Sequence, residues 1–413
     1  MSYPIVTLQK GKEMNAVFRH PWIFSGALVK RPEGIEHGDI IRVADAGGNI
    51  VGTGTYSAKS SIAVRLFEFS AGGGPASGGG DAAINKDVKI DKAWFVAKFR
   101  EADERRRLLG LGEGTGTDGY RVVFGETDGV PGLVVDRYRD VFVIQISTAG
   151  IDTLRQTVVD ALKEAFSASV VYERSDLHVR KEEALKDQVG ALVGEAAESA
   201  EFGEDGMKFV AEVAAGQKTG FFLDQRSLRR AIARYAKGRE TLNLFSYSGA
   251  AGIAAMKGGA KSVANVDSSA TALAACVRNA EMNGIEPHVF SVEQADVFQY
   301  LSAKTEPAFD MVLVDPPALI KSQRDGDEGR KAYHFLNRAA LRLVRDGGVF
   351  VTSSCSHFLN EEDFAFILRR ASVQAGVRLD LLEVVRQAPD HPTSVYFPES
   401  AYLTAFIFRV ARI

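Results

Sequence analysis

Alternating apolar and polar residues mark the beginning of the chain as β-rich. The alternation is clearest in Gly38–Asp45 and Ser61–Glu68, and glycine and aspartate lie between such runs. We therefore predict a small β-barrel within residues 1–70. The next segment, 71–90, begins with glycine, alanine, serine and proline, which cannot build a packed core, so we predict a linker or loop there.

The segment 91–195 is predicted to form a central α+β domain. Apolar residues at helical spacing predict a helix over Asp91–Leu109. Runs of β-branched and aromatic residues then predict successive strands, followed by a helix over 152–166 and a further strand over 170–173. The successive strands are expected at 121–124, 132–136 and 141–146.

The pattern changes in residues 196–413, where short apolar runs alternate with helical segments. Strands are expected at 241–245, 262–266, 289–291, 309–314 and 348–352. This alternation is typical of a parallel, doubly wound sheet, so the predicted fold class is α/β. Asp224 is expected to cap a helix over 225–236, and the last strand, 401–410, is expected to close the sheet as an antiparallel edge.

Composition excludes several classes of protein. Hydrophobic residues make up 46% and charged residues 25% of the 413 residues, as in ordinary globular proteins. No apolar run reaches the roughly 18 residues that span a bilayer, and the first residues lack the pattern of a signal peptide. Two cysteines cannot form a disulfide framework, and metal-ligand spacing is missing, so we expect a cytoplasmic protein without a membrane or metal partner.

Charge is more informative locally than over the whole chain. The net charge of −3 does not predict nucleic-acid binding, but Lys218–Arg239 is rich in lysine and arginine and could contact phosphates. Arg226, Arg230 and Arg234 lie four apart and therefore share one helix face. A solvated helix face is the alternative interpretation of this stripe.

Two of the expected strands end in side chains that can carry chemistry. One strand is followed by Asp315 and two prolines, and another by Cys355. In an open α/β sheet, ligands bind beyond the carboxyl ends of the strands, so these two side chains are expected to face one cleft. A thiol and a carboxyl group in one cleft suggest nucleophilic attack on a ring, assisted by an acid.

A cofactor pocket is expected beyond three neighbouring strands. Leu242–Gly252 reads as a strand, a turn with small residues and the start of a helix, where an anionic group can bind. Asp267 and Asp296 follow the next two strands, and an acid at the first of these positions can bind ribose hydroxyls. The GxGxxG pattern of nicotinamide enzymes is missing, which favours S-adenosylmethionine. The alternative is that Gly249 and Gly252 only allow close helix packing.

Several motifs distributed over nearly the whole chain are more specific than these patterns. They are His20–Gly26, Tyr120–Asp136, Arg174–Asp176, Lys218–Arg226, Asn243–Gly249, Ser353–Ser356 and Arg386–Pro392. With them, the chain resembles the bacterial ribosomal RNA large subunit methyltransferase I family, whose members use S-adenosylmethionine to form 5-methylcytosine. One departure is His357, which stands where glycine is frequent and lies next to the expected base pocket.

The resemblance implies an N-terminal PUA domain (1–70), a central α+β domain and a C-terminal Rossmann-like class I methyltransferase (196–413). It also implies a cytoplasmic enzyme acting on 23S ribosomal RNA, and it leaves open whether the chain forms a homodimer. The implied catalytic residues are Cys355 and Asp315. Implied cofactor contacts are Phe245, Tyr247, Gly249, Asp267, Ser268, Asp296, Val297 and Asp315, and candidate RNA-binding residues are Lys218, Arg226, Arg230 and Arg234.

The chemistry of cytosine explains why these residue types are needed. Carbon 5 is too weak a nucleophile to take a methyl group directly, and addition of a Cys355 thiolate to carbon 6 would activate it. Asp315, in a protonated form, could bond ring nitrogen 3, which requires a raised carboxyl pKa. Two alternatives stay open: methylation of an exocyclic amine, which needs no thiol, and a non-catalytic RNA-binding protein.

Some chemically suggestive residues have simpler interpretations. Cys276 lies among alanines in an expected helix and is predicted to pack in the core. His391 is predicted to be structural. Trp22 and Phe24 could stack on RNA bases, but the core of the barrel is the preferred position for both.

Overall fold

The computed structural model describes residues 3–30, 33–70, 88–195, 198–320, 322–356 and 358–413. The segment 71–87 of the expected linker and His357 therefore lie outside the described residues. The chain divides into two compact units, called unit 1 and unit 2 below. Unit 1 comprises Met1–Phe202, Ala211–Phe221 and Asp390–Ser400, and unit 2 comprises Gly203–Val210, Phe222–Pro389 and Ala401–Ile413.

Unit 1 begins with a small β-sheet domain. Its sheet has the order β1-β3-β4-β5-β2, and the short helix α1 (Met14–Val17) precedes β2. The strands are β1 (Ile5–Thr7), β2 (Trp22–Phe24), β3 (Ile40–Ala44), β4 (Ile50–Tyr56) and β5 (Ile62–Phe69). Both strands predicted here from alternation are confirmed as β3 and β5.

The prediction of a core position for Trp22 and Phe24 is wrong. Side chains of successive strand residues point to opposite faces of a sheet. In β2 it is Ile23, 1% exposed, that fills the core, while Phe24 is exposed and Trp22 is half-buried. The Trp22 ring packs at 4.8 Å from that of Phe397, and its indole N–H donates to Glu126 at 2.8 Å.

The second part of unit 1 is a mixed sheet with helices, as predicted. Its strand order is β10-β9-β8-β7-β6, and the pair β8 and β9 is parallel. The elements are α2 (Lys92–Leu108), β6 (Gly119–Phe124), β7 (Leu133–Tyr138), β8 (Val141–Ile146), α3 (Ala149–Thr153), α4 (Arg155–Phe166), β9 (Val170–Ser175), α5 (Val179–Glu182) and β10 (Gln188–Val193). Asp91 caps α2 by accepting a hydrogen bond from the backbone N–H of Trp94.

Residues 211–221 and 390–400 also belong to unit 1, although they are distant from the rest of it in the sequence. Asp390 accepts a hydrogen bond from the backbone N–H of Arg121, and its own carbonyl accepts one from the buried Arg106. His391 is 2% exposed and packs near Phe124, so the structural interpretation of this histidine is confirmed. Parts of the range 196–413, predicted as one domain, therefore belong to the compact unit of the N-terminal half.

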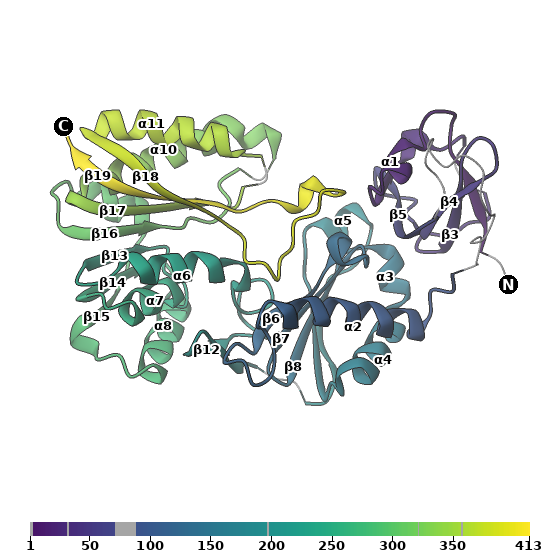
Figure 1. Ribbon diagram of the computed structural model, residues 1–413, viewed down its shortest axis with the longest axis horizontal. Helices are drawn as coiled ribbons and strands as arrows, with labels where there is room; N and C mark the ends of the chain where they lie inside the picture. The colour runs from purple at the N-terminus through teal and green to yellow at the C-terminus, as the bar shows by residue number, and fades with distance from the viewer. Residues whose placement is uncertain (1–2, 31–32, 71–87, 196–197, 321, 357) are drawn as a thin grey trace. The chain divides into compact units, whose positions relative to one another are not determined.

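Unit 2 is built on a doubly wound sheet with the order β15-β14-β13-β16-β17-β19-β18 (Figure 1). Pairing from β15 across to β17 is parallel, and β19 runs antiparallel to both of its neighbours. The strands are β13 (Glu240–Leu244), β14 (Ser262–Asp267), β15 (Phe290–Gln294), β16 (Phe309–Val314), β17 (Val344–Ser354), β18 (Val377–Arg386) and β19 (Thr404–Arg412). The five predicted strands are confirmed, and a hairpin of β11 (Ala200–Glu204) and β12 (Met207–Ala211) precedes them along the chain.

The expectation of a sheet closed by the last strand is only partly correct. The C-terminal strand β19 is antiparallel, but it lies between β17 and β18 rather than at the edge. The strand at this edge of the sheet is β18, and the sequence pattern does not predict it. It is largely half-exposed along its length, so it lacks the apolar run that marks the central strands.

Helices cover both faces of this sheet (Figure 1). The helices α6, α7 and α8 follow one another on one face, and α9, α10 and α11 on the other. Their bounds are α6 (Arg226–Tyr235), α7 (Ala250–Lys257), α8 (Ala270–Met282), α9 (Val297–Ala303), α10 (Gly326–Arg342) and α11 (Glu361–Ala375). Asp224 does not cap α6 as predicted, because a short 3₁₀ turn (Leu223–Gln225) intervenes; it accepts a hydrogen bond from the hydroxyl of Tyr402 instead.

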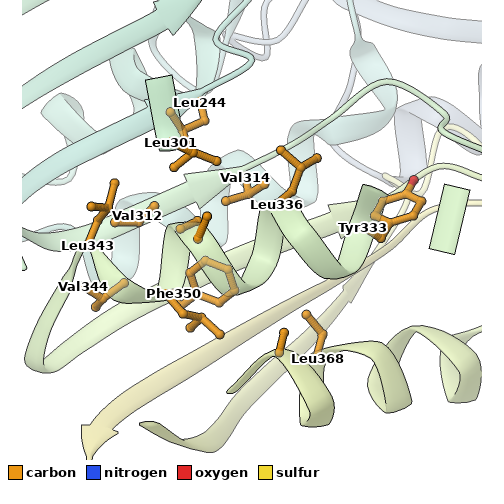
Figure 2. Packing of buried hydrophobic residues seen from close by; sticks show 14 of the residues in the cluster. Leu244, Leu301, Val312, Val314, Tyr333, Leu336, Leu343, Val344, Phe350 and Leu368 are labelled. Carbon is orange, nitrogen blue, oxygen red and sulfur yellow. The ribbon is translucent and has the colours of Figure 1, made fainter. Parts of the chain in front are cut away.

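The main core of unit 2 lies between the sheet and the helices α9, α10 and α11. Leu336 of α10 and Leu343, directly after this helix, contribute, with Val312, Val314 and Phe350 of the strands, and each is at most 1% exposed. Figure 2 shows this packing, with Tyr333 at the opposite end of the cluster from Leu343 and Val344. The rigid sheet formed in this way determines where the loops beyond the strand ends lie.

Candidate functional site

Every strand from β13 to β17 ends in a loop that carries a residue singled out by the sequence. In chain order these are Phe245, Asp267, Asp296, Asp315 and Cys355. Because the strands are parallel, all five residues lie at the same edge of the sheet. The strand order reverses between β13 and β16, and ligands of doubly wound sheets bind at such a switch point.

The loop after β13 has an unusual backbone. Phe245 and Tyr247 have φ angles of 58° and 46°, although neither is glycine. Such left-handed conformations cost roughly 1–3 kcal/mol each and cluster at functional sites. Between these two residues, Ser246 is 6% exposed, and its hydroxyl has no hydrogen-bond partner within the described part of the chain. A buried hydroxyl without a partner is costly, so a ligand atom is a suitable partner for it.

Asp267 holds this loop in place. One carboxylate oxygen accepts the backbone N–H of Tyr247 and the other that of Ser269, both at 2.9 Å. A carboxylate has about four acceptor positions, so these bonds do not exhaust its capacity. Asp296, at the end of the neighbouring loop, is exposed and caps α9 through the backbone N–H of Gln299.

The remaining predicted cofactor contacts differ in exposure. Ser268 is exposed, and its carbonyl accepts a hydrogen bond from the Gln294 side chain. Val297 is 3% exposed and belongs to the core. Phe245 is half-buried, and its ring packs edge-on against Phe298 of α9, whose ring stacks on Phe335.

The two glycines of the expected cofactor motif have packing roles. A side chain at Gly249 would meet the Cys276 sulfur at 2.3 Å, and one at Gly252 would meet Asn265 at 2.5 Å. Gly249 also has a φ of 77° at the start of α7. Cys276 is fully buried, as predicted, and burial raises the pKa of its thiol to about 12. Close packing of α7 against β14 and α8 therefore requires both glycines, whether or not a ligand approaches them.

Asp315 is held by two neutral donors. The amide of Gln225 donates to one carboxyl oxygen at 2.6 Å, and the hydroxyl of Ser353 donates to the other. The second contact follows from the register, since Val314 of β16 pairs with Thr352 of β17. Hydrogen bonds to both oxygens stabilise a charged carboxylate. A small cavity of about 10 Å³, enough for one water molecule, borders Asp315, Gln225 and Ser353.

Cys355 lies in a turn fixed by serine hydroxyls. Its side chain is partly exposed, whereas Ser354 and Ser356 on either side are 3% and 2% exposed. The backbone N–H of Ser356 donates to the hydroxyl of Ser354 at 3.3 Å, which closes the turn around the cysteine. Both serine hydroxyls also contact the hydroxyl of Tyr333, at 3.0 Å each. Cys355 and Asp315 thus follow adjacent parallel strands.

The predicted basic residues have different surroundings. Arg226 is 1% exposed and forms an ion pair with the fully buried Glu204, which Arg229 also contacts. That burial removes Arg226 from the candidates for phosphate contact. Arg230 and Arg234 are exposed at the surface of α6, where Asp205 and Glu383 raise the pKa of their guanidinium groups. Lys218, in unit 1, is also exposed.

Sequence reasoning missed several residues that complete this arrangement. No role is predicted from sequence for Gln225, Ser246 or Tyr333, and Ser353 is predicted only as part of the motif Ser353–Ser356. The run of serines around Cys355 was a usable signal, because buried hydroxyls need partners. The identity of the partner, Tyr333 of α10, depends on tertiary packing that no local pattern encodes.

Two kinds of feature are absent from the described residues. Among them, no group of three or more histidine, cysteine, aspartate or glutamate side chains is arranged to hold a metal ion. None of the helices in the described ranges is both long enough and apolar enough to cross a membrane.

Comparison with protein families gives two matches. A family model described as S-adenosylmethionine-dependent methyltransferase matches residues 142–409, and a model of a PUA-like domain matches residues 6–69. The first match includes the whole edge from Phe245 to Cys355.

Individual relatives match along the full length. Proteins named ribosomal RNA large subunit methyltransferase I from Klebsiella pneumoniae and Aeromonas hydrophila are 34% and 35% identical to this chain. The matches cover 99% and 98% of this chain and 98% of each relative.

Solved structures show the same fold. A protein from Streptococcus mutans, provisionally named a SAM-dependent methyltransferase, superposes with a TM-score of 0.80 at 21% identity, covering 98% of this chain and all of the other. A second structure, named as a methyltransferase complexed with SAH, also gives 0.80 at 21% identity, over 99% of this chain and all of the other.

Proposed function

Because this chain belongs to the ribosomal RNA large subunit methyltransferase I family of S-adenosylmethionine-dependent enzymes, we propose that it methylates carbon 5 of a cytosine in large-subunit ribosomal RNA. The observation that supports this reaction best is the position of Cys355 and Asp315 after adjacent parallel strands. A thiol and a carboxyl group at one sheet edge are the two groups that covalent activation of a cytosine ring requires.

The residues at the sheet edge fit the cofactor of this family. S-adenosylmethionine, when bound, supplies an electrophilic methyl group on a sulfonium. The buried hydroxyl of Ser246, without a partner in the described part of the chain, offers a hydrogen bond to a ligand in the loop after β13. Asp267 retains acceptor capacity for two ribose hydroxyls, and exposed Asp296 is available for a polar group of the base.

Cys355 is proposed to act as the nucleophile. Its thiolate adds to carbon 6 of the cytosine, so that a sulfur–carbon bond forms and electron density moves to carbon 5. With S-adenosylmethionine bound, carbon 5 would take its methyl group, the methyl–sulfur bond would break, and the demethylated cofactor would leave as a neutral thioether. Removal of the carbon 5 proton by a base returns an electron pair to the ring, the sulfur–carbon bond breaks, and the thiolate leaves.

Asp315 is proposed to recognise the base and to stabilise the ring during addition. As a carboxylate, the form that Gln225 and Ser353 favour, it can accept a hydrogen bond from the cytosine 4-amino group, which uracil lacks. In a protonated form it can donate to ring nitrogen 3, which gains electron density as the thiolate adds. The fixed orientation of its two oxygens supports either contact.

The RNA must present an unstacked base and be held by its phosphates. Chemistry on a base requires that the base leaves the stack, and phosphate contacts position the strand. Arg230 and Arg234 on α6 and Lys218 in unit 1 are the proposed phosphate contacts, because each is exposed. Arg226 is not among them, since its guanidinium group is buried beside Glu204.

Replacement of each cysteine tests the reaction type. Cys355→Ala should lower methyl transfer to ribosomal RNA by on the order of 10⁴-fold or more, because covalent activation is lost. Cys276→Ala is the matched control and should remain active, since that thiol is buried in α8. Methyl transfer would be followed with labelled cofactor, and the product nucleoside identified by mass spectrometry. Retained transfer by Cys355→Ala would instead favour methylation of an exocyclic amine.

A further inference from the structure

We propose that Tyr333 is a positioning residue for the reaction: its hydroxyl group fixes the turn Ser354–Ser356 so that the Cys355 thiol is presented to the cytosine ring. This inference rests on the proposed function, because it assigns to Cys355 the role of nucleophile. Tyr333 itself does not have to touch substrate or cofactor.

The Tyr333 hydroxyl is hydrogen-bonded to two serines. The hydroxyl of Ser354 donates to the Tyr333 oxygen at 3.0 Å. The hydroxyls of Tyr333 and Ser356 share a second hydrogen bond of 3.0 Å, in which either group can be the donor. One tyrosine hydroxyl therefore holds the residues before and after the cysteine at the same time.

The same group of contacts reaches the loop that follows Asp315. The backbone N–H of Ile320 donates to the Ser356 hydroxyl at 3.2 Å. Ser356 is thus shared between Tyr333 and the segment that begins with Asp315-Pro-Pro. The loops that carry the proposed nucleophile and the proposed base-binding acid are joined through one serine, so a shift of Ser356 would change their separation.

The helix α10 supplies a firm support for Tyr333. The side chain is fully buried at the end of the core cluster shown in Figure 2. One turn further along α10, Asn337 donates to the Tyr333 carbonyl at 2.7 Å and accepts from the Thr352 hydroxyl at 2.6 Å. The helix therefore contacts the end of β17 at two levels, at Thr352 and at the turn around Cys355.

The protonation state of Tyr333 suits a positioning role. Burial raises the pKa of Tyr333 above that of an ordinary tyrosine. Since deprotonation would then occur only above about pH 10, the phenol keeps its proton throughout the usual assay range.

The test compares two Tyr→Phe variants in the core of unit 2. Tyr333→Phe removes both hydrogen bonds and keeps the ring. Tyr300→Phe is the matched control, since Tyr300 of α9 belongs to the same core cluster and its burial raises the pKa of its hydroxyl to about 12. Steady-state kinetics with ribosomal RNA gives kcat and KM, and iodoacetamide labelling against pH follows the Cys355 thiol directly, because Cys276 is buried and has a pKa of about 12.

We expect Tyr333→Phe to lower kcat by about 10- to 100-fold while KM changes little, as for a misplaced reacting group. Its labelling curve should also differ from those of the wild type and Tyr300→Phe, a change that a purely structural role would not produce. Wild-type kcat and an unchanged labelling curve for Tyr333→Phe would overturn the inference.

Two further variants keep the inference testable if Tyr333→Phe does not fold. Ser354→Ala and Ser356→Ala each remove one of the two bonds and should each lower kcat by about 3- to 30-fold. Unchanged kcat in both would contradict the positioning role. Cys355→Ala separates the two proposals: if that variant is inactive while Tyr333→Phe is fully active, only the inference about Tyr333 fails, whereas an active Cys355→Ala overturns both.

Discussion

Acidic residues near the two ends of the parallel strands in unit 2 have different kinds of partner. The two ends are called the two edges of the sheet below. At the edge where the parallel strands begin, Glu240 pairs with Lys261 and Arg345, and Arg345 also pairs with Asp310. These cations lower the pKa of Glu240, with Lys261 contributing most. The acids there neutralise nearby cations at the surface.

At the edge where the parallel strands end, the two acids at the ends of β14 and β15 are held by backbone N–H donors. Asp267 accepts the backbone N–H groups of Tyr247 and Ser269, and Asp296 accepts that of Gln299. Such donors orient a carboxylate without cancelling its charge. Asp267 and Asp296 are therefore oriented by donors that bring no countercharge, as the proposed binding of a ligand with hydroxyl groups and a positive charge requires.

Replacing the acids near the two ends of β16, Asp310 and Asp315, should test the comparison with the largest effect. Asp315→Asn is expected to lower kcat by on the order of 10²–10⁴-fold, because the amide cannot take both proposed protonation states. Asp310→Asn, at the beginning of β16, should leave kcat unchanged and change stability by less than about 1 kcal/mol, as for a surface ion pair. Kinetics and chemical denaturation of both variants measure this, and equal effects on kcat would contradict the assignment.

The second comparison concerns cofactor affinity. Asp267→Asn should weaken S-adenosylmethionine binding by about 10- to 100-fold, since charge-assisted hydrogen bonds are lost. Glu240→Gln is the control and should bind normally in calorimetric titration.

Because the pKa of Glu240 is lowered, its contribution to stability is present above the ordinary pKa and is lost as the pH falls through the lowered value. The effect of Glu240→Gln on the unfolding midpoint should therefore be greater at pH 7 than in acid.

The third comparison concerns two buried hydroxyl groups near opposite ends of β13, and the expected change in cofactor affinity is smaller. Ser246 and Thr241 both lack a hydrogen-bond partner for the hydroxyl within the described residues. Ser246→Ala should weaken cofactor binding by about threefold to tenfold, because only this hydroxyl lies at the ligand edge. Thr241→Val should leave the affinity unchanged, and an equal loss in both variants would show that packing rather than contact is responsible.

The smallest effect concerns RNA phosphates. Arg230→Gln should weaken RNA binding modestly and reduce the slope of log affinity against log salt concentration by about 1. Arg378→Gln is a matched control, since Arg378 is also exposed and paired with a surface carboxylate, that of Asp380, but lies at the edge where the strands begin. Filter binding at several salt concentrations gives both slopes, and identical slopes would remove Arg230 from the proposed RNA contacts.

The contrast between the two edges also explains what could be predicted from sequence. Apolar runs such as Phe309–Val314 reveal buried strands, and the polar residue that follows each run falls at the carboxyl edge by topology alone. The strand ends, the family and the burial of Cys276 could therefore be predicted. Their hydrogen-bond partners could not, because Gln225 and Tyr333 reach the site from helices far away in sequence.

Helix periodicity misled in one case for a similar reason. The spacing of Arg226, Arg230 and Arg234 correctly places them along one helix, but it does not show that the first is buried. Arg226 is covered because Glu204, from a hairpin earlier in the chain, provides a buried countercharge. Burial of a charged side chain depends on such a distant partner, which local spacing cannot identify.

The most direct test of the central claim is the capture of the bond between Cys355 and the cytosine ring. RNA that carries 5-fluorocytosine at the target position stalls the reaction, because fluorine at carbon 5 cannot leave as a proton does. After incubation with S-adenosylmethionine, mass spectrometry of the digested protein should find a methylated fluorocytosine attached to the peptide that contains Cys355. Efficient methylation of the unsubstituted RNA with no adduct at Cys355 under these conditions would contradict the account.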